Sequence, residues 1–214
     1  MIVYGLARVI LPILFRLKGV RLVVEGRENV PEHGPFVLVA NHGSNLDALL
    51  AQVACPRSVW SMAKSSQFRH PVTRWLLVHL NGFPTRRYQV DPQAVRTALR
   101  VIERGGGLGL YPEGERSWDG SLQPLRTGSV RFLLKVGVPL LPCGISGSYA
   151  LQPRWSRSIG RGPARVRFGR PFELGRHDSR AARDAAVEEA TSRIRTALAA
   201  LVDEEVASEG RSEG

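Results

Sequence analysis

Short apolar runs alternate with amphipathic helical patterns from Gly19 onward, and this alternation restricts the possible folds more than any other feature of the chain. Such alternation is typical of an α/β domain, in which helices flank a largely parallel sheet. The expected strands are residues 21–25, 36–40, 59–63, 108–111, 140–145 and 164–168. The expected helices are residues 44–54, 71–80, 92–104, 128–136 and 179–201. No internal repeat or linker divides residues 19–202, so we expect a single domain with a mixed, largely parallel central sheet.

The helix expected at residues 92–104 has the clearest signals. Asp91 is expected to cap it, and Pro92 suits its first turn because that position needs no backbone N–H donor. An apolar stripe follows at helical spacing, formed by Val95, Ala98, Leu99 and Ile102.

The N-terminal segment, residues 1–18, is apolar, but its unbroken apolar run extends only over residues 9–15. A helix that spans a bilayer needs about 20 such residues, and the segment lacks the basic start and cleavage site of a secretory signal. We therefore predict an amphipathic helix that lies on the membrane, where Arg8, Arg16 and Lys18 reach anionic headgroups. The alternative is a helix that packs on the domain, because the same apolar stripe serves either purpose.

The 214 residues carry a formal net charge of +11, and the sequence pI is near 10.9. This excess favours a polyanionic partner: nucleic acid, an anionic membrane or a phosphorylated or CoA-like ligand. The sequence has no zinc-finger spacing, no aromatic RNP-like motif and no long basic tract, so we do not expect nucleic acid. An anionic membrane surface or an anionic substrate is favoured instead.

Only two cysteines occur, Cys55 and Cys143, and neither has a Cys or His neighbour at metal-ligand spacing. We therefore expect no disulfide and no metal site, and both side chains are expected to be small buried hydrophobes in a reducing compartment. Residues 203–214 are acidic and almost free of apolar side chains, which predicts a disordered tail.

His42 directly follows the apolar strand expected at residues 36–40, at the position where α/β domains place their active sites. If Ser44 caps the next helix, His42 lies outside that helix and folds back over its first turn, where Asp47 lies. A carboxylate there holds one imidazole nitrogen and leaves the other as a base. The competing interpretation is a capping box, in which Asp47 only closes the start of the helix.

A second polar segment, residues 111–117, also follows an apolar strand and is expected at the same edge of the sheet as His42. Arg116 has the planar fork that suits a phosphate. The alternative is a polar turn in which a glutamate pairs with an arginine.

Four blocks now stand in order along the chain: His42-x4-Asp47, residues 82–87, Pro-Glu-Gly-Glu-Arg at residues 112–116, and Val-Pro-Leu-Leu-Pro at residues 138–142. Together they resemble the lysophospholipid/glycerolipid acyltransferase family, of the 1-acyl-sn-glycerol-3-phosphate acyltransferase type. The resemblance implies an acyl-CoA or acyl-carrier-protein donor, a lysophospholipid acceptor, no further cofactor and no metal. It also implies a role in phospholipid biosynthesis. The protein is then expected to be peripheral or monotopic on the cytoplasmic face of the membrane.

Carried over by position, the resemblance makes His42 the catalytic base and Asp47 the residue that orients it. The other matched residues are expected to bind substrate, and they are Lys64, Arg87 (with Arg86 beside it), Glu113, Gly114 and Arg116.

Glu115 departs from the family pattern, which usually has threonine between the glycine and the arginine. A carboxylate that points into the site would repel a phosphate. Three hypotheses therefore stay open: an acyltransferase for 1-acylglycerol 3-phosphate, an acyltransferase for a different polar-lipid acceptor, and a non-catalytic basic protein that binds membrane surfaces. The intact pair of His42 and Asp47 argues against the third.

Overall fold

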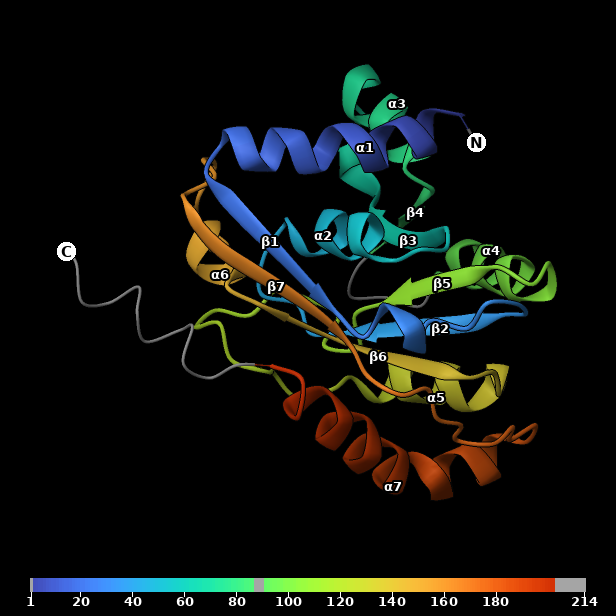
Figure 1. The fold of residues 1–214 in the computed structure, drawn as a ribbon. Coiled ribbons are helices and arrows are strands. Elements are labelled where there is room, and N and C mark those ends of the chain that lie inside the picture. Colours follow the sequence, from blue (N-terminus) through green and yellow to red (C-terminus); the bar gives the residue numbers. More distant parts are fainter. Residues whose placement is uncertain (1, 87–90, 203–214) are drawn as a thin grey trace.

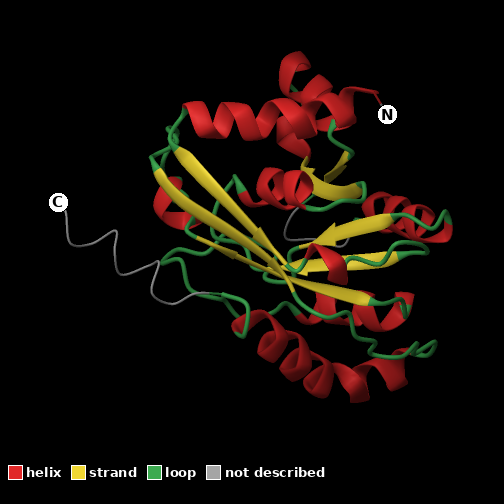
Figure 2. Cartoon of the chain, viewed as in Figure 1, coloured by secondary structure: helices red, strands yellow, loops and turns green. Residues whose placement is uncertain are grey.

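The computed structural model describes residues 2–86 and 91–202, and these form one α/β domain (Figures 1 and 2). The strands are β1 (Val20–Glu25), β2 (Phe36–Ala40), β3 (Val59–Lys64), β4 (Gly82–Thr85), β5 (Gly107–Leu110), β6 (Leu140–Ser146) and β7 (Gly162–Phe168). The helices are α1 (Ile2–Leu17), α2 (Asp47–Ala54), α3 (Pro71–His79), α4 (Pro92–Glu103), α5 (Thr127–Val136), α6 (Ser148–Leu151) and α7 (Arg180–Ala199). Arg87 and the tail predicted at residues 203–214 lie outside the described residues.

The strands form one sheet in the order β1-β7-β6-β2-β5-β3-β4. All neighbouring pairs are parallel except β6 and β7, which run antiparallel. The sheet is therefore mixed and largely parallel, as the sequence predicts. β2 lies at its centre between β5 and β6, so the residues that follow β2 emerge in the middle of the sheet edge.

Successive side chains of β2 enter two different hydrophobic cores, one on each face of the sheet, because strand side chains alternate in direction. Phe36, Leu38 and Ala40 pack with α1 and α2 on one face. Val37 and Val39 pack with α4, α5 and α7 on the other. Figure 1 shows the sheet with α1 and α2 on one side and α5 and α7 on the other. Burial on both faces explains why residues 36–40 form an unbroken apolar run.

The expected elements all exist, with ends that shift by a few residues. The largest shift is at α2, which begins at Asp47 with Leu46 as its N-cap, so the expectation that Ser44 caps it is wrong. Asp91 caps α4 as predicted: its carboxylate accepts the backbone N–H groups of Gln93 and Ala94. The sequence analysis missed β4 and the short α6. β4 contains Pro84, which lacks an N–H donor, and it is tolerated because β4 is the edge strand.

Helix α1 is fixed to the domain on one side. Tyr4 and Phe15 are buried, the Tyr4 hydroxyl accepts the N–H of Val59, and Arg8 Nη1 donates to the carbonyl oxygen of Pro56 at 2.9 Å. Its other side is exposed and apolar, with Leu6, Val9, Ile10, Ile13, Leu14 and Leu17 each between 47% and 77% exposed. The helix therefore packs on the domain and still presents a second apolar face.

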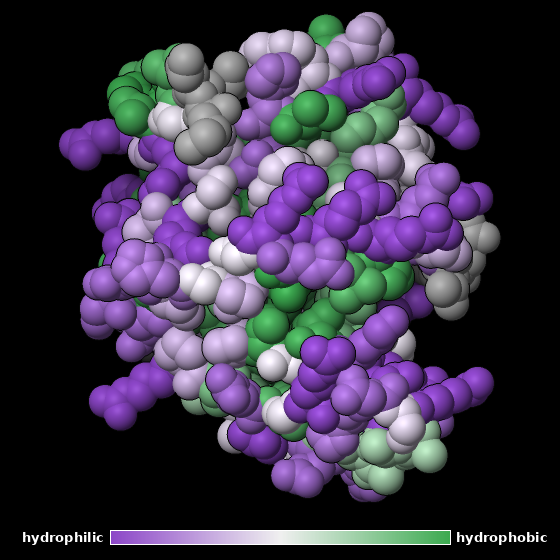
Figure 3. Space-filling view, turned by 90° about the vertical axis from the view of Figure 1, so that its right-hand side faces the viewer, coloured by the Kyte–Doolittle hydropathy of each residue, from purple (hydrophilic) through white to green (hydrophobic). Residues whose placement is uncertain are grey.

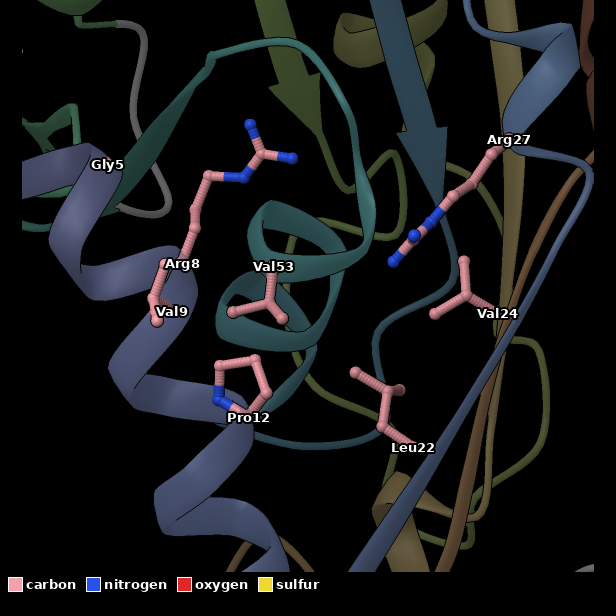
Figure 4. A pocket seen from close by; sticks show the side chains of 8 residues that line it. All are labelled: Gly5, Arg8, Val9, Pro12, Leu22, Val24, Arg27 and Val53. Atoms are coloured by element: carbon pink, nitrogen blue, oxygen red, sulfur yellow. The ribbon is translucent and has the colours of Figure 1, made fainter.

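A cavity of about 530 Å³ separates part of α1 from β1 and α2. In Figure 4, Arg8 and Arg27 extend into it from opposite walls, and Leu22, Val24 and Val53 supply apolar surface. The side of the molecule at the right of Figure 1 is covered mainly by hydrophilic side chains, with hydrophobic ones in its middle (Figure 3). Within residues 2–86 and 91–202, no helix is long and apolar enough to cross a membrane.

Candidate active site

The turn after β2 is held by Asn41, a buried residue that bonds to β6 in both directions. Its Nδ2 donates to the carbonyl oxygen of Ile145 at 2.8 Å, and its Oδ1 accepts the N–H of Ile145 at 2.7 Å. An amide side chain can make this reciprocal pair because it carries both a donor and an acceptor. The backbone at His42 is thereby fixed to the centre of the sheet.

His42 is held on three sides. Its Nδ1 lies 2.9 Å from Oδ2 of Asp47, and its ring stacks on Tyr111 with centroids 4.3 Å apart. Its backbone N–H donates to Oε1 of Glu113 at 2.6 Å, and its carbonyl oxygen accepts the N–H of Ser117 at 2.7 Å. The side chain is 11% exposed. The imidazole therefore has one fixed nitrogen, and Nε2 is left for a substrate.

Asp47 holds the turn before α2 as well as the imidazole. Besides His42, its Oδ2 accepts the backbone N–H of Ser44 at 2.8 Å, which is one of the two bonds of a capping box. Ser44 Oγ accepts the N–H of Leu46 and donates to the carbonyl oxygen of Gln152, rather than capping α2. Asp47 is fully buried at the first residue of α2, where the helix dipole stabilises a negative charge.

Glu113 holds the backbone of the turn at His42 through hydrogen bonds. It is buried, and its two carboxylate oxygens accept backbone N–H groups of His42 and Gln123, at 2.6 and 2.8 Å. Burial raises the pKa of Glu113 to about 7, with a further contribution from nearby Asp47, although the two hydrogen bonds lower it. The structure thus shows Glu113 as a support of the histidine backbone, and direct contact with substrate stays a prediction.

Tyr111 completes the wall behind the histidine. Burial, and to a lesser degree the charge of Asp47, raises the pKa of Tyr111 well above its usual value. The phenol stays neutral, and its ring provides a flat apolar surface for the imidazole.

A cavity of about 710 Å³ opens beside this pair, with His42 in its wall. The rest of the wall comes from β3, the ends of β4 and β5, the segment after β5, the start of α4 and the residues around α5. Its lining includes Met62, Thr85, Arg86, Asp91, Tyr111, Gly114, Leu125, Arg126 and Phe132. The cavity therefore combines the imidazole of His42, apolar surface and two arginines, of which Arg86 lies 3.6 Å from the Asp91 carboxylate and Arg126 pairs with Glu115.

Arg126 lines the cavity although the family resemblance does not point to it. Its Nε donates to the carbonyl oxygen of Glu113 at 3.0 Å, and its Nη2 bonds Oε1 of Glu115 at 3.0 Å. Gly114 makes this approach possible, because its φ is +74° and an added Cβ would collide with the Arg126 side chain. Arg126 lies outside the matched blocks, so only the fold brings it to the third block.

Glu115, the departure from the family pattern, is paired with two arginines. Its Oε2 lies 3.1 Å from Nη1 of Arg154, and its Oε1 lies 3.0 Å from Arg126. Partial burial raises the pKa of Glu115, but bonds to Arg154 and Arg126 outweigh burial, so the pKa lies below its usual value. The carboxylate is charged and its charge is balanced within the protein.

The remaining residues to which the resemblance points differ in whether they line the cavity. Arg116 donates from Nη1 to the carbonyl oxygen of Arg154, and it is not among the lining residues. Lys64 is exposed at the end of β3, also outside the lining. Arg86 lines the cavity and its backbone N–H donates to Asp91 at 2.9 Å. Within the described residues, no three His, Cys, Asp or Glu side chains form a group that could hold a metal.

Comparison with known proteins adds an independent observation. The model of the Acyltransferase family matches residues 21–146, which contain β2 to β6, all of β1 but its first residue, and every residue that lines the cavity. The chain belongs to the Acyltransferase family.

Several relatives in the Acyltransferase family are named 1-acyl-sn-glycerol-3-phosphate acyltransferases. The chloroplastic protein of Brassica napus is 30% identical over 155 residues, which cover 70% of this chain and 44% of the relative. The protein of Borreliella burgdorferi is 29% identical over 130 residues, which cover 59% of this chain and 51% of the relative. The chain thus spans about half the length of these curated relatives.

A solved structure of the family has the same fold. The crystal structure of the 1-acyl-sn-glycerophosphate (LPA) acyltransferase, PlsC, from Thermotoga maritima matches with a TM-score of 0.71 at 27% identity. The match covers 89% of this chain and 77% of that chain. The mixed, largely parallel sheet flanked by helices is therefore the fold of an acyltransferase.

Proposed function

We propose that this protein transfers a fatty acyl group from a thioester to the free hydroxyl of a 1-acylglycerol 3-phosphate, in phospholipid biosynthesis. The observation that carries this proposal is the 2.9 Å pair of His42 and Asp47 in the wall of a cavity at the sheet edge. The names of the family relatives support the same reaction.

The proposed mechanism uses His42 as a general base and forms no acyl-protein intermediate. Nε2 takes the proton of the acceptor hydroxyl while that oxygen attacks the thioester carbonyl. The tetrahedral intermediate then breaks its C–S bond, and the thiolate receives the proton back from the imidazolium. Asp47 stabilises the imidazolium through Nδ1–H, and such assistance contributes on the order of 10² to 10⁴ in rate.

The proposed acceptor carries a phosphate, because Arg126 and Arg86 both line the cavity. Glu115 does not oppose this proposal, since its charge is balanced by Arg126 and Arg154. A guanidinium group binds phosphate through charge-assisted hydrogen bonds with defined geometry. Arg86 and Arg126 would therefore orient the acceptor without taking part in bond formation.

The proposed donor is the acyl thioester of coenzyme A or of an acyl-carrier protein, with no further cofactor. The apolar part of the cavity wall, formed by Met62, Leu125 and Phe132, is suited to hydrocarbon. We also propose peripheral attachment to the cytoplasmic face of a membrane through α1, whose outer face is apolar. Arg16 in its last turn and Lys18 directly after it are exposed.

The test is thiol release from acyl-CoA, and from an acyl-carrier protein, in the presence of 1-acylglycerol 3-phosphate. Wild-type protein should release thiol only when the acceptor is present, and His42→Ala should reduce the rate by at least about 10²-fold. A matched control is His33→Ala, which changes an exposed histidine outside the cavity. Equal rates for wild type and His42→Ala would exclude the mechanism, and activity only with phosphate-free lipids would exclude the acceptor.

A further inference from the structure

Helix α3 exposes apolar side chains along its whole length. None of its residues is buried, whereas α2, α4, α5 and α7 each bury several. Its large apolar residues are strongly exposed: Val72 66%, Trp75 55%, Leu76 44% and Val78 51%. Three of these, at positions 72, 75 and 76, share one helical face because residues three and four apart are neighbours. A contiguous apolar patch of this kind on a folded domain marks an interaction surface.

The charge around this helix has one sign. Residues 48–90 contain six Arg or Lys and no Asp or Glu, although the chain as a whole has 19 carboxylates. Lys64, Arg69 and Arg74 are exposed next to or on α3. Residues 1–24, which include α1, likewise contain four Arg or Lys and no carboxylate. Ten of the basic residues behind the net charge of +11 therefore lie in two acid-free segments, and each segment contains a helix with an exposed apolar face.

Both helices lie at the same end of the molecule, as Figure 1 shows. α3 connects β3 to β4, and these strands contribute Met62 and Thr85 to the wall of the cavity, followed by Arg86. Any partner that binds to α3 is therefore close to the part of the cavity wall that β3 and β4 form.

We propose that α3 is a second membrane-contacting helix, which places Val72, Trp75 and Leu76 in the interfacial region of an anionic bilayer. Lys64, Arg69 and Arg74 then face the headgroup phosphates. The bilayer is the occupant that this surface fits, because the patch joins apolar area and an indole to cations with no acidic side chain nearby. Together with α1, α3 would hold the cavity wall at the lipid surface, so this inference extends the proposed function.

The first experiment compares the full chain with the variant Trp75→Ser/Leu76→Ser. Binding is measured by co-sedimentation with vesicles of phosphatidylglycerol and phosphatidylcholine, and with vesicles of phosphatidylcholine alone. We expect binding to the anionic vesicles to weaken by on the order of tenfold, because the variant removes exposed apolar area that the bilayer would bury. Trp155→Ser is the matched control, since Trp155 is 66% exposed but lies outside both acid-free segments. Binding equal to that of the control would overturn the proposal.

A second arm tests charge. Arg69→Gln/Arg74→Gln should weaken binding to anionic vesicles and leave binding to neutral vesicles unchanged, whereas Arg180→Gln, an exposed change on α7, should have a smaller effect. A concentration-dependent dimer without lipid that Trp75→Ser/Leu76→Ser dissociates would instead show that the patch binds a second copy of the chain.

A third arm detects insertion directly. The native thiols of Cys55 and Cys143 are fully buried, so a polarity-sensitive fluorophore on Leu76→Cys reports one position. We expect a blue shift with anionic vesicles, and no shift would overturn the proposal. These binding measurements need no catalysis, so they can succeed or fail independently of acyl transfer. On a soluble short-chain acceptor, Trp75→Ser/Leu76→Ser should retain wild-type turnover, and only turnover of vesicle-borne acceptor should fall.

Discussion

The Nδ1 atom of His42 lies 2.9 Å from Oδ2 of Asp47, and that same oxygen accepts the backbone N–H of Ser44. One buried carboxylate therefore both orients the imidazole and fixes the turn that leads into α2. The two roles separate in experiment because catalysis depends on the charge of Asp47, whereas the bond to Ser44 needs only an acceptor oxygen.

Asp47→Asn should lower turnover by about 10³ to 10⁴-fold while the protein stays folded. The asparagine oxygen can still accept the N–H of Ser44, but a neutral amide no longer stabilises the imidazolium or fixes the tautomer of His42. We expect the free energy of unfolding to fall by about 1 kcal/mol, as for a weakened cap. The measurement is turnover together with a urea unfolding curve.

The double variant His42→Ala/Asp47→Asn provides the control, because residues that act as a unit have non-additive effects. Its turnover should match that of His42→Ala alone. If Asp47→Asn lowers stability and leaves turnover unchanged, the carboxylate is only a helix cap.

Glu113 should make the protein less stable as the pH rises. Its pKa is raised from 4.5 to about 7 in the fold, so the folded state holds this proton more tightly than the unfolded state does. The resulting loss in the free energy of unfolding is absent below pH 4.5, develops as the pH rises toward 7 and is complete above pH 7. A shift of this size corresponds to roughly 3 kcal/mol.

The measurement is the free energy of unfolding at pH 5 and at pH 8 for wild type and Glu113→Gln. The free energy of unfolding of wild type minus that of the variant should be smaller at pH 8 than at pH 5, because glutamine does not titrate. Glu103→Gln is the control: it changes an exposed glutamate of α4, and its stability difference from wild type should be the same at pH 5 and pH 8. A difference that rises with pH would show that the two N–H bonds of Glu113 outweigh its burial.

The sequence predicted the features that depend on local patterns. Residues 36–40 form a strand, as their unbroken apolar run predicts, and His42 and Asp47 meet because five residues suffice for a strand-to-helix turn. Asp91 caps α4 through a local side-chain bond to Gln93 and Ala94. The order of neighbouring residues determines each of these contacts.

The features that the sequence did not predict depend on pairing between distant segments. Glu113 reaches the N–H of His42 only because β5 lies beside β2, and Arg126 reaches the third block only across Gly114. The exposed face of α3 was also unpredictable, since an apolar stripe on a short helix usually packs inward. Periodicity shows that a helix has an apolar face, and not what covers it.

Ile13→Glu on α1 should weaken binding to anionic vesicles by at least about tenfold. The change removes exposed apolar area and adds a negative charge that the headgroups repel. Stability should change by less than about 0.5 kcal/mol, because Ile13 is 55% exposed. Val23→Glu is the control, since Val23 is 43% exposed on β1, on the opposite face of the strand from Leu22 and Val24. Similar vesicle binding for both variants would show that α1 serves only to pack on the domain.

Arg126→Ala should raise the KM for 1-acylglycerol 3-phosphate by about 10 to 100-fold, because a charge-assisted hydrogen bond contributes about 1.5 to 3 kcal/mol. The KM for the acyl donor should stay unchanged. Arg116→Ala is the matched control: the family resemblance assigns the phosphate to Arg116, but of these two arginines Arg126 lines the cavity and Arg116 does not. A larger rise in the acceptor KM for Arg116→Ala than for Arg126→Ala would show that Arg116, in the third block, binds the phosphate.

Glu115→Thr completes this test, because it restores the usual family residue and releases Arg126 and Arg154 from their shared carboxylate. Each of these partly exposed pairs is worth about 0.2 to 1 kcal/mol, so the variant should lose little stability. Its KM for the phosphate-bearing acceptor should equal that of wild type or fall below it, since Arg126 keeps its bond to the Glu113 carbonyl oxygen. A rise in KM would show that Glu115 positions Arg126 for the phosphate. Wild-type activity confined to phosphate-free lipids would instead show that the carboxylate selects a different head group.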